Sequence, residues 1–205
     1  MPLAFEYGLS RRFSLLVEPV LWTRIHDKGI GTATGVGDVE MTLTTLLLGE
    51  QPGRPALALG TEVKIPTSKN IRIGSGKADV AFYLIGSQKH GRWDTHANLG
   101  YTVIGKPAGV AVKNVESFAL AGEYRASRRF DFVAEVFGGS AARTDSAENL
   151  PVTMVSAITP EIGGSEFVGE VGVRFHPAET LTWSLGLSYD NNRALLLHPG
   201  VSARW

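Results

Sequence analysis

The pattern E-Y-x-x-S-R-R-F-x-x-x-x-E occurs twice in this 205-residue chain, at residues 6–18 and again at residues 123–135. In both copies a polar turn separates two runs in which apolar and polar residues alternate. Because successive side chains of a strand point to opposite faces, this alternation separates an apolar face from a polar one. Each copy therefore predicts a β-hairpin with an S-R-R tip.

The tip also predicts how the two strands of each hairpin pair. A three-residue loop at residues 10–12 places Tyr7 opposite Leu15 on the apolar face. In the second copy the same rule places Arg125 opposite Asp131 on the polar face. Opposite charges at facing positions attract, so the sequence predicts a cross-strand ion pair there.

Composition excludes several classes of protein. Lys plus Arg and Asp plus Glu number 20 each, so no net charge points to nucleic acid. The absence of cysteine excludes disulfides and thiolate metal sites, and the five histidines are never spaced as paired ligands, so no metal or cofactor is expected. The longest apolar runs are far shorter than the ~18 residues of a membrane-spanning helix. No secretory leader precedes Leu3 in the chain as given, whether removed or never included.

Alternating runs recur along the whole chain, most of them close to the ~9–11 residues that a tilted strand needs to cross a bilayer. Short connections alternate with longer, Gly-rich ones, which predicts short turns at one end of a sheet and long loops at the other. Bacterial outer-membrane barrels sort their connections in this way, with the short turns in the periplasm. The eleven or so expected strands are residues 3–9, 13–25, 37–48, 56–66, 78–87, 92–104, 115–126, 130–140, 166–175, 181–190 and 195–205.

Aromatic residues on the apolar face lie near the short turns or the C-terminus. Such a belt is typical of the membrane interface, where amphipathic rings are favoured. The alternative is that these rings form the ordinary core of a soluble β-sandwich. The expected interface residues are Tyr7, Phe13, Trp93, Tyr124, Phe130, Phe175, Trp183 and Trp205.

The expected fold is all-β, an antiparallel transmembrane β-barrel of about 12 strands, with about 11 visible in this chain. Single-chain barrels have an even number of strands, so an odd count indicates a strand that is not yet identified. We expect one barrel domain over residues 1–205 that lacks an N-terminal strand, or an extra strand within residues 152–158.

Five short motifs, spread over much of the chain, carry a resemblance to a known family. They are residues 6–9 (EYGL), 35–38 (GVGD), 64–67 (KIPT), 74–76 (GSG, followed by Asp79) and 96–101 (HANLGY). With them the sequence resembles the bacterial outer-membrane proteins of the transporter or MetA-pathway of phenol degradation family. The resemblance implies an outer-membrane location, a lipid bilayer as partner and, from the family name, small hydrophobic or aromatic solutes.

The C-terminal run also resembles the last strand of such barrels. It ends on the aromatic Trp205, a feature that barrel-assembly machinery reads. Two departures accompany the resemblance: Pro199 removes a hydrogen-bond donor from this strand, and the leader and early strand usual in the family are absent from the chain as given.

The polar face supports three hypotheses. The first is a channel whose charged walls select what passes. The second is a structural barrel with paired charges filling its interior, in which the long loop at residues 140–165 binds a partner. The third is a barrel hydrolase using His96 and Asp94 with Ser184 or Ser188, although no nucleophile has a special turn context and no catalytic residue is expected. The expected lumen-lining residues are Glu6, Glu18, Glu40, Glu62, Lys64, Asp94, His96, Glu123, Arg125, Asp131, Glu135, Glu170, Arg174 and Arg204.

Overall fold

A computed structural model describes residues 3–27, 31–108, 111–142 and 165–203. The described residues form strands joined by turns and loops, and they contain no helix long and apolar enough to cross a membrane. The strands are β1 (Phe5–Gly8), β2 (Phe13–Pro19), β3 (Thr23–Asp27), β4 (Gly31–Gly35), β5 (Val39–Leu48), β6 (Ala56–Ile65), β7 (Asp79–His90), β8 (Trp93–Val103), β9 (Val115–Arg125), β10 (Phe130–Gly139), β11 (Glu166–Ala178), β12 (Leu181–Asp190) and β13 (Leu195–Ala203).

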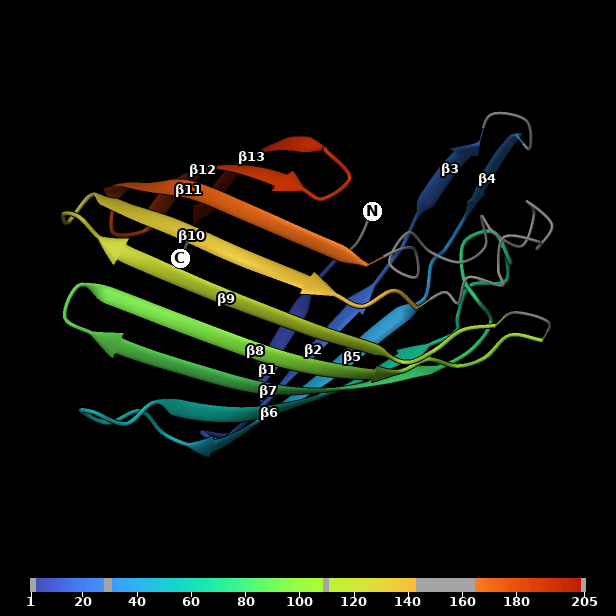
Figure 1. Ribbon diagram of the computed structural model, residues 1–205, viewed down its shortest axis with the longest axis horizontal. Helices are drawn as coiled ribbons and strands as arrows, with labels where there is room; N and C mark the ends of the chain where they lie inside the picture. Colours follow the sequence, from blue (N-terminus) through green and yellow to red (C-terminus); the bar gives the residue numbers. More distant parts are fainter. Residues whose placement is uncertain (1–2, 28–30, 109–110, 143–164, 204–205) are drawn as a thin grey trace.

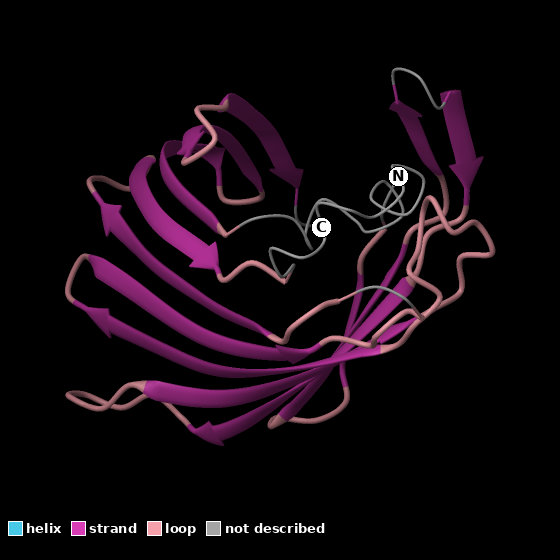
Figure 2. Cartoon of the chain, turned by 45° about the vertical axis from the view of Figure 1, so that its right-hand side comes forward, coloured by secondary structure: helices cyan, strands magenta, loops and turns pink. Residues whose placement is uncertain are grey.

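Eleven of these strands form one antiparallel sheet in the order β1-β2-β5-β6-β7-β8-β9-β10-β11-β12-β13. Each strand of the sheet therefore pairs with its neighbours along the chain, apart from the step over β3 and β4. Figure 1 shows the β7–β8 and β9–β10 turns at one end of the sheet and the longer loops at the other. The sheet curls strongly about its long axis (Figure 2). The predicted all-β barrel architecture, with its eleven visible strands, is confirmed.

One expected strand has different bounds. The run at residues 13–25 ends as β2 at Pro19, and Val20 adds one more pair of backbone hydrogen bonds, with Gly37 and Asp38. The chain then forms β3 and β4, which pair only with each other in a hairpin that projects beyond the sheet (Figure 1). The long loop expected around residues 25–36 therefore contains a hairpin of its own. Residues 152–158, the other candidate for an extra strand, lie outside the described part of the chain.

The predicted pairing of both S-R-R hairpins is confirmed. Tyr7 faces Leu15 in the first hairpin. Arg125 faces Asp131 in the second. Turn length fixes hairpin register, and a slip of one residue would move every side chain to the wrong face.

Burial follows the reverse of a soluble protein's pattern. In β12 the side chains of Trp183 and Leu187 are 55% and 42% exposed, whereas the intervening Ser188 is only 4% exposed. Within the described residues no large side chain is fully buried, and the apolar cluster around Ile104 and Val112 is small. The β-sandwich alternative is therefore wrong, because a sandwich would bury these rings between two sheets. An apolar face turned outward is what a barrel presents to lipid.

Seven of the eight expected interface aromatics share this apolar face near the short turns. The register aligns Trp93 with Tyr124, and Phe130 with Phe175 and Trp183, on neighbouring strands. Two pairs are in ring contact, with centroids 4.8 Å apart for Trp93 and Tyr124 and 4.9 Å apart for Phe130 and Phe175. Tyr7 and Phe13 belong to the first hairpin, at the same end of the sheet, and Trp205 lies outside the described residues.

A charge placed on the apolar face tests its contact with lipid. Leu99 is 62% exposed in the middle of β8, and Leu9 is 53% exposed beside the first hairpin tip. We expect Leu99→Arg to lower the free energy of unfolding in phospholipid vesicles by ~2–4 kcal/mol and Leu9→Arg by ~1 kcal/mol or less, because the cost depends on depth in the bilayer. Equal effects in a denaturant titration would contradict a lipid-facing wall.

Candidate functional site

The candidate site is the polar face, which we define as the side of the sheet opposite the exposed apolar side chains. The strand register puts every described member of the expected charged set on this one face. Arg204 lies outside the described residues. The members are Glu6, Glu18, Glu40, Glu62, Lys64, Asp94, His96, Glu123, Arg125, Asp131, Glu135, Glu170 and Arg174.

Near the short turns, three strands share a charged network. The Arg174 guanidinium on β11 reaches across β10 to pair with the Glu123 carboxylate on β9. Side chains from strands two apart meet over β10, which indicates that the polar face is the concave one. The network therefore ties β9 and β11 together in addition to their backbone ladders.

Asp131 has a different partner from the predicted one. Its Oδ2 lies 2.7 Å from Nε2 of His176, and His176 Nδ1 lies 2.9 Å from Oγ1 of Thr182. Arg125 faces Asp131 in the register, but the structure pairs the carboxylate with the imidazole on the other neighbouring strand. Sequence reasoning missed His176 because it ended that strand at Phe175, one residue too early. The alternation of Arg174 and His176 was the signal that could have placed it.

At the long-loop end, Lys64 and Asp79 form a second ion pair across β6 and β7. Their side chains are only 13% and 11% exposed. The other oxygen of the carboxylate, Oδ1, accepts a hydrogen bond from the Gly105 amide at 2.7 Å. Asp79 thus holds both a neighbouring strand and the loop after β8. The sequence placed Asp79 only in a family motif, without this role.

A tyrosine lies on the polar face midway between these networks. Tyr83 on β7 donates a hydrogen bond of 3.4 Å from its hydroxyl to Glu62 Oε2. Gly60 and Gly100 face Tyr83 from the two neighbouring strands. A Cβ atom on Gly100 would lie 2.9 Å from the Tyr83 ring, and one on Gly60 would lie 3.2 Å from it. The two glycines therefore let the ring rest close against the sheet.

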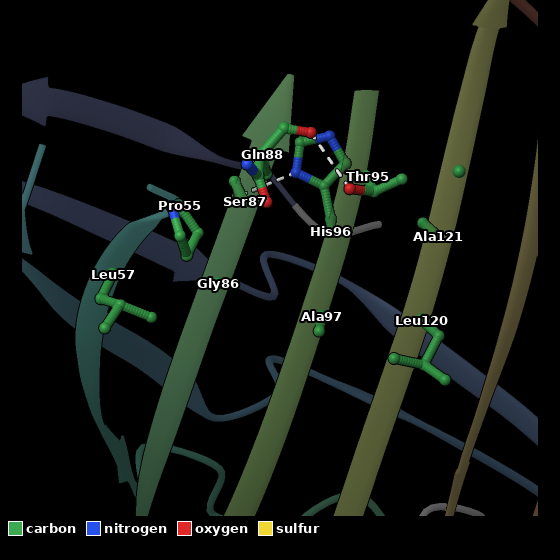
Figure 3. A pocket seen from close by; sticks show the side chains of 11 residues that line it. Pro55, Leu57, Gly86, Ser87, Gln88, Thr95, His96, Ala97, Leu120 and Ala121 are labelled. Carbon is green, nitrogen blue, oxygen red and sulfur yellow. Dashed lines mark hydrogen bonds between the residues drawn. The ribbon is translucent and has the colours of Figure 1, made fainter. Parts of the chain in front are cut away.

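An open cavity of about 530 Å³ lies over β6 to β9, and Figure 3 shows the residues that line it. The register places most of them, including Leu57, Ala97 and Leu120, on the apolar face, whereas Ser87 and His96 belong to the polar face. Ser87 Oγ and His96 Nδ1 share a hydrogen bond of 2.8 Å across β7 and β8. His96 Nε2 lies 3.5 Å from Asp94 Oδ1, and that carboxylate also lies 4.0 Å from the Lys89 ammonium through Oδ2. The polar face of β7 and β8 therefore carries exposed polar groups on regular strands.

Comparison with models of known protein families identifies the family of this chain. The family model described as "Putative MetA-pathway of phenol degradation" matches residues 4–149. The chain belongs to this family. No curated protein matches it.

Two solved structures of outer-membrane proteins resemble this MetA-pathway family chain in fold. The NanC porin matches with a TM-score of 0.62 and 11% identity, covering 100% of this chain and 92% of the porin. The COG4313 outer membrane channel from Pseudomonas putida F1 matches with a TM-score of 0.64 and 15% identity, covering 98% of this chain and 77% of the channel. The fold is that of an outer-membrane β-barrel, as predicted.

The geometry gives the hydrolase hypothesis little support in this MetA-pathway family chain. Ser188 bonds His198 at 2.9 Å and lies on β12, whereas His96 lies on β8, four strands away in the sheet. The hydroxyl that does contact His96 belongs to Ser87, within a regular strand that offers no turn amides to hold an oxyanion. The 3.5 Å contact of His96 with Asp94 is too long for a well-formed hydrogen bond. Among the described residues, no cluster of three His, Asp or Glu side chains could hold a metal ion.

The polar face is acidic within the described part of the chain. Its strand cations are Lys64, Lys89, Arg125 and Arg174, and two of them already contact carboxylates closely. Glu135 and Glu170 face each other directly on β10 and β11. The carboxylates on this face are Glu6, Glu18, Glu40, Glu62, Asp79, Asp94, Glu123, Asp131, Glu135, Glu166, Glu170 and Asp190.

Two substitutions distinguish the observed partner of Asp131 from the expected one. We expect His176→Ala to lower the free energy of unfolding in phospholipid by ~1–3 kcal/mol, because it leaves a carboxylate that is only 8% exposed without its donor. Arg125→Gln should cost less than ~0.5 kcal/mol, since the Arg125 side chain is exposed. Urea titrations that reversed this order would show that Arg125 is the real partner.

Proposed function

We propose that this chain is a passive channel of the bacterial outer membrane that admits small solutes. One observation carries the proposal: the exposed face of a single curved sheet is apolar, and its concave face holds ion pairs and hydrogen-bonded polar groups. A wall with this polarity suits lipid on one side and water on the other. Resemblance in fold to a porin and to an outer membrane channel supports the same function.

In this proposal the charged set of the polar face lines the lumen, and the aromatic belt lies at the membrane interface. Charged walls tune which ions and solutes enter a pore. The family description names phenol degradation, so small aromatic compounds are the solute class that we propose. Hydrolysis is not part of the proposed function.

Two further elements belong to the proposal. Within the described residues β1 and β13 are the sheet's edges, so closure of the wall requires pairing that the described part does not contain. A lipid-spanning wall has no open edge, because unpaired backbone groups are costly in hydrocarbon. We also propose that the C-terminal strand is what barrel-assembly machinery recognises. Its outward positions include Leu197 and Val201.

Conductance tests whether a path through the lumen exists. The full chain, reconstituted in a planar phospholipid bilayer, should produce discrete current steps in KCl. Liposomes that contain it should swell in arabinose faster than in the larger stachyose. A folded barrel that conducts no ions would overturn the channel proposal and favour the plugged alternative, in which the long loop at residues 140–165 binds a partner.

The acidic polar face predicts selectivity for cations. Under a KCl gradient the reversal potential should have the sign of K⁺ preference, because carboxylates attract cations and repel chloride. Glu135→Gln combined with Glu170→Gln should reduce that preference. Glu50→Gln, which removes a carboxylate from the β5–β6 turn, is the matched control and should change it less. A channel that prefers chloride would contradict the acidic lumen.

A further inference from the structure

The S-R-R tips of the two duplicated hairpins have no part in a channel lumen. Both tips have the same hydrogen bonds: the Ser10 and Ser127 amides donate to the carbonyls of Phe13 and Phe130, each at 3.1 Å. In each tip the serine Oγ also accepts a hydrogen bond from the backbone amide of the second arginine, at 3.1 Å in both. Two tips 117 residues apart in sequence therefore present an arginine pair on the same rigid turn.

The other short turns at this end of the sheet add arginines as well. Arg54 lies in the turn between β5 and β6, and Arg92 in the turn between β7 and β8. These turns contain no lysine, and their acidic residues are Glu50 and, between β11 and β12, Glu179. We call the six exposed arginines of the short turns the arginine rim: Arg11, Arg12, Arg54, Arg92, Arg128 and Arg129.

The arginine rim is free of ion pairs. No member forms a salt bridge with a carboxylate in the described part of the chain. Arg54 and Arg92 make side-chain hydrogen bonds only to carbonyl oxygens, of Gly49 at 3.2 Å and of Ala126 at 3.5 Å. The positive charge of the rim is therefore available to a partner, whereas the polar face beside it is acidic.

The arginine rim borders the aromatic belt. Arg12 directly precedes Phe13, Arg92 precedes Trp93, and Arg129 precedes Phe130. Each of these rings is exposed on the apolar face, with Trp93 52% exposed. Rings of this kind mark the interface of a bilayer, so the guanidinium groups lie at the height of the lipid headgroups.

We propose that the arginine rim binds the phosphate groups of anionic phospholipids in the leaflet that surrounds the short turns. Guanidinium matches phosphate with two parallel hydrogen bonds, which explains why the rim uses arginine and no lysine. A lipid fits better than a soluble anion because the rim lies directly beside lipid-facing rings. The partner is thus a bilayer component, independent of the solute in the lumen, but the inference rests on the same membrane-spanning fold.

The fluorescence of native tryptophans can report lipid binding at the arginine rim. The chain has four tryptophans. Replacing Trp22 and Trp205 by Phe, in the parent protein and in each variant, leaves Trp93 and Trp183 as the two fluorescent indoles. Both lie on the apolar face near the short turns. Quenching of their fluorescence by brominated phosphatidylglycerol, compared with brominated phosphatidylcholine, gives the relative affinity for the anionic lipid. We expect a preference of about fivefold or more for phosphatidylglycerol at low salt.

Variants that remove positive charges test whether the rim arginines cause the preference for phosphatidylglycerol. R11Q/R12Q/R128Q/R129Q should reduce the ratio towards one, and R11Q/R12Q and R128Q/R129Q should each reduce it in part. K69Q/K106Q, which removes two exposed cations at the opposite end of the sheet, should leave it unchanged. Added NaCl should weaken the wild-type preference, because it screens exposed charges.

Two outcomes would overturn the inference: equal affinity for both lipids in the parent protein, or a preference that persists in the variants lacking rim arginines. If the fourfold variant does not insert, the two double variants still decide the question. A channel that conducts but shows no lipid preference would refute lipid binding by the arginine rim and leave the channel proposal standing. A sealed barrel with the preference intact would refute only the channel.

Discussion

The inter-strand hydrogen bonds of one continuous sheet are what hold this chain in shape. No large side chain of the described residues is fully buried, so a hydrophobic core contributes little. In hydrocarbon there is no water to satisfy backbone amides and carbonyls, and a ladder of paired strands is one of the few ways to satisfy them. The fold therefore depends on each strand staying in register with its neighbours.

Register in turn decides the chemistry of each face. Since one residue of slip would exchange the two faces, the short turns that fix each hairpin also keep the carboxylates on the concave side. The ion pairs reinforce this arrangement at both ends: Lys64 with Asp79 near the long loops, and Arg174 with Glu123 near the short turns. Six exposed arginines lie in the short turns, beyond the strands that carry the polar face.

Local signals in the sequence predicted most of this fold. Alternation with a period of two gave the strands and the shared face of the charged residues, and turn length gave the pairing of Tyr7 with Leu15. Contacts that depend on a third strand were not accessible. The contact of Asp131 with His176 required knowing which strand lies on the other side of β10, and how far β11 extends. The β3–β4 hairpin was missed because β3 begins inside the run at residues 13–25 that reads as one strand, and β4 lies in what reads as a Gly-rich loop.

The placement of Tyr83 between two glycines has a consequence for the space on the concave side of the sheet. A phenol ring packed close against the strands takes up little of the space on that side, whereas the same ring pushed away from them would fill more of it. Gly60 and Gly100 leave room for the Tyr83 ring beside the two neighbouring strands, so two residues with no side chain decide how close this ring lies to the sheet. In the channel that we propose, a single methyl group added at either glycine would therefore narrow the conduit at this level without altering any charge.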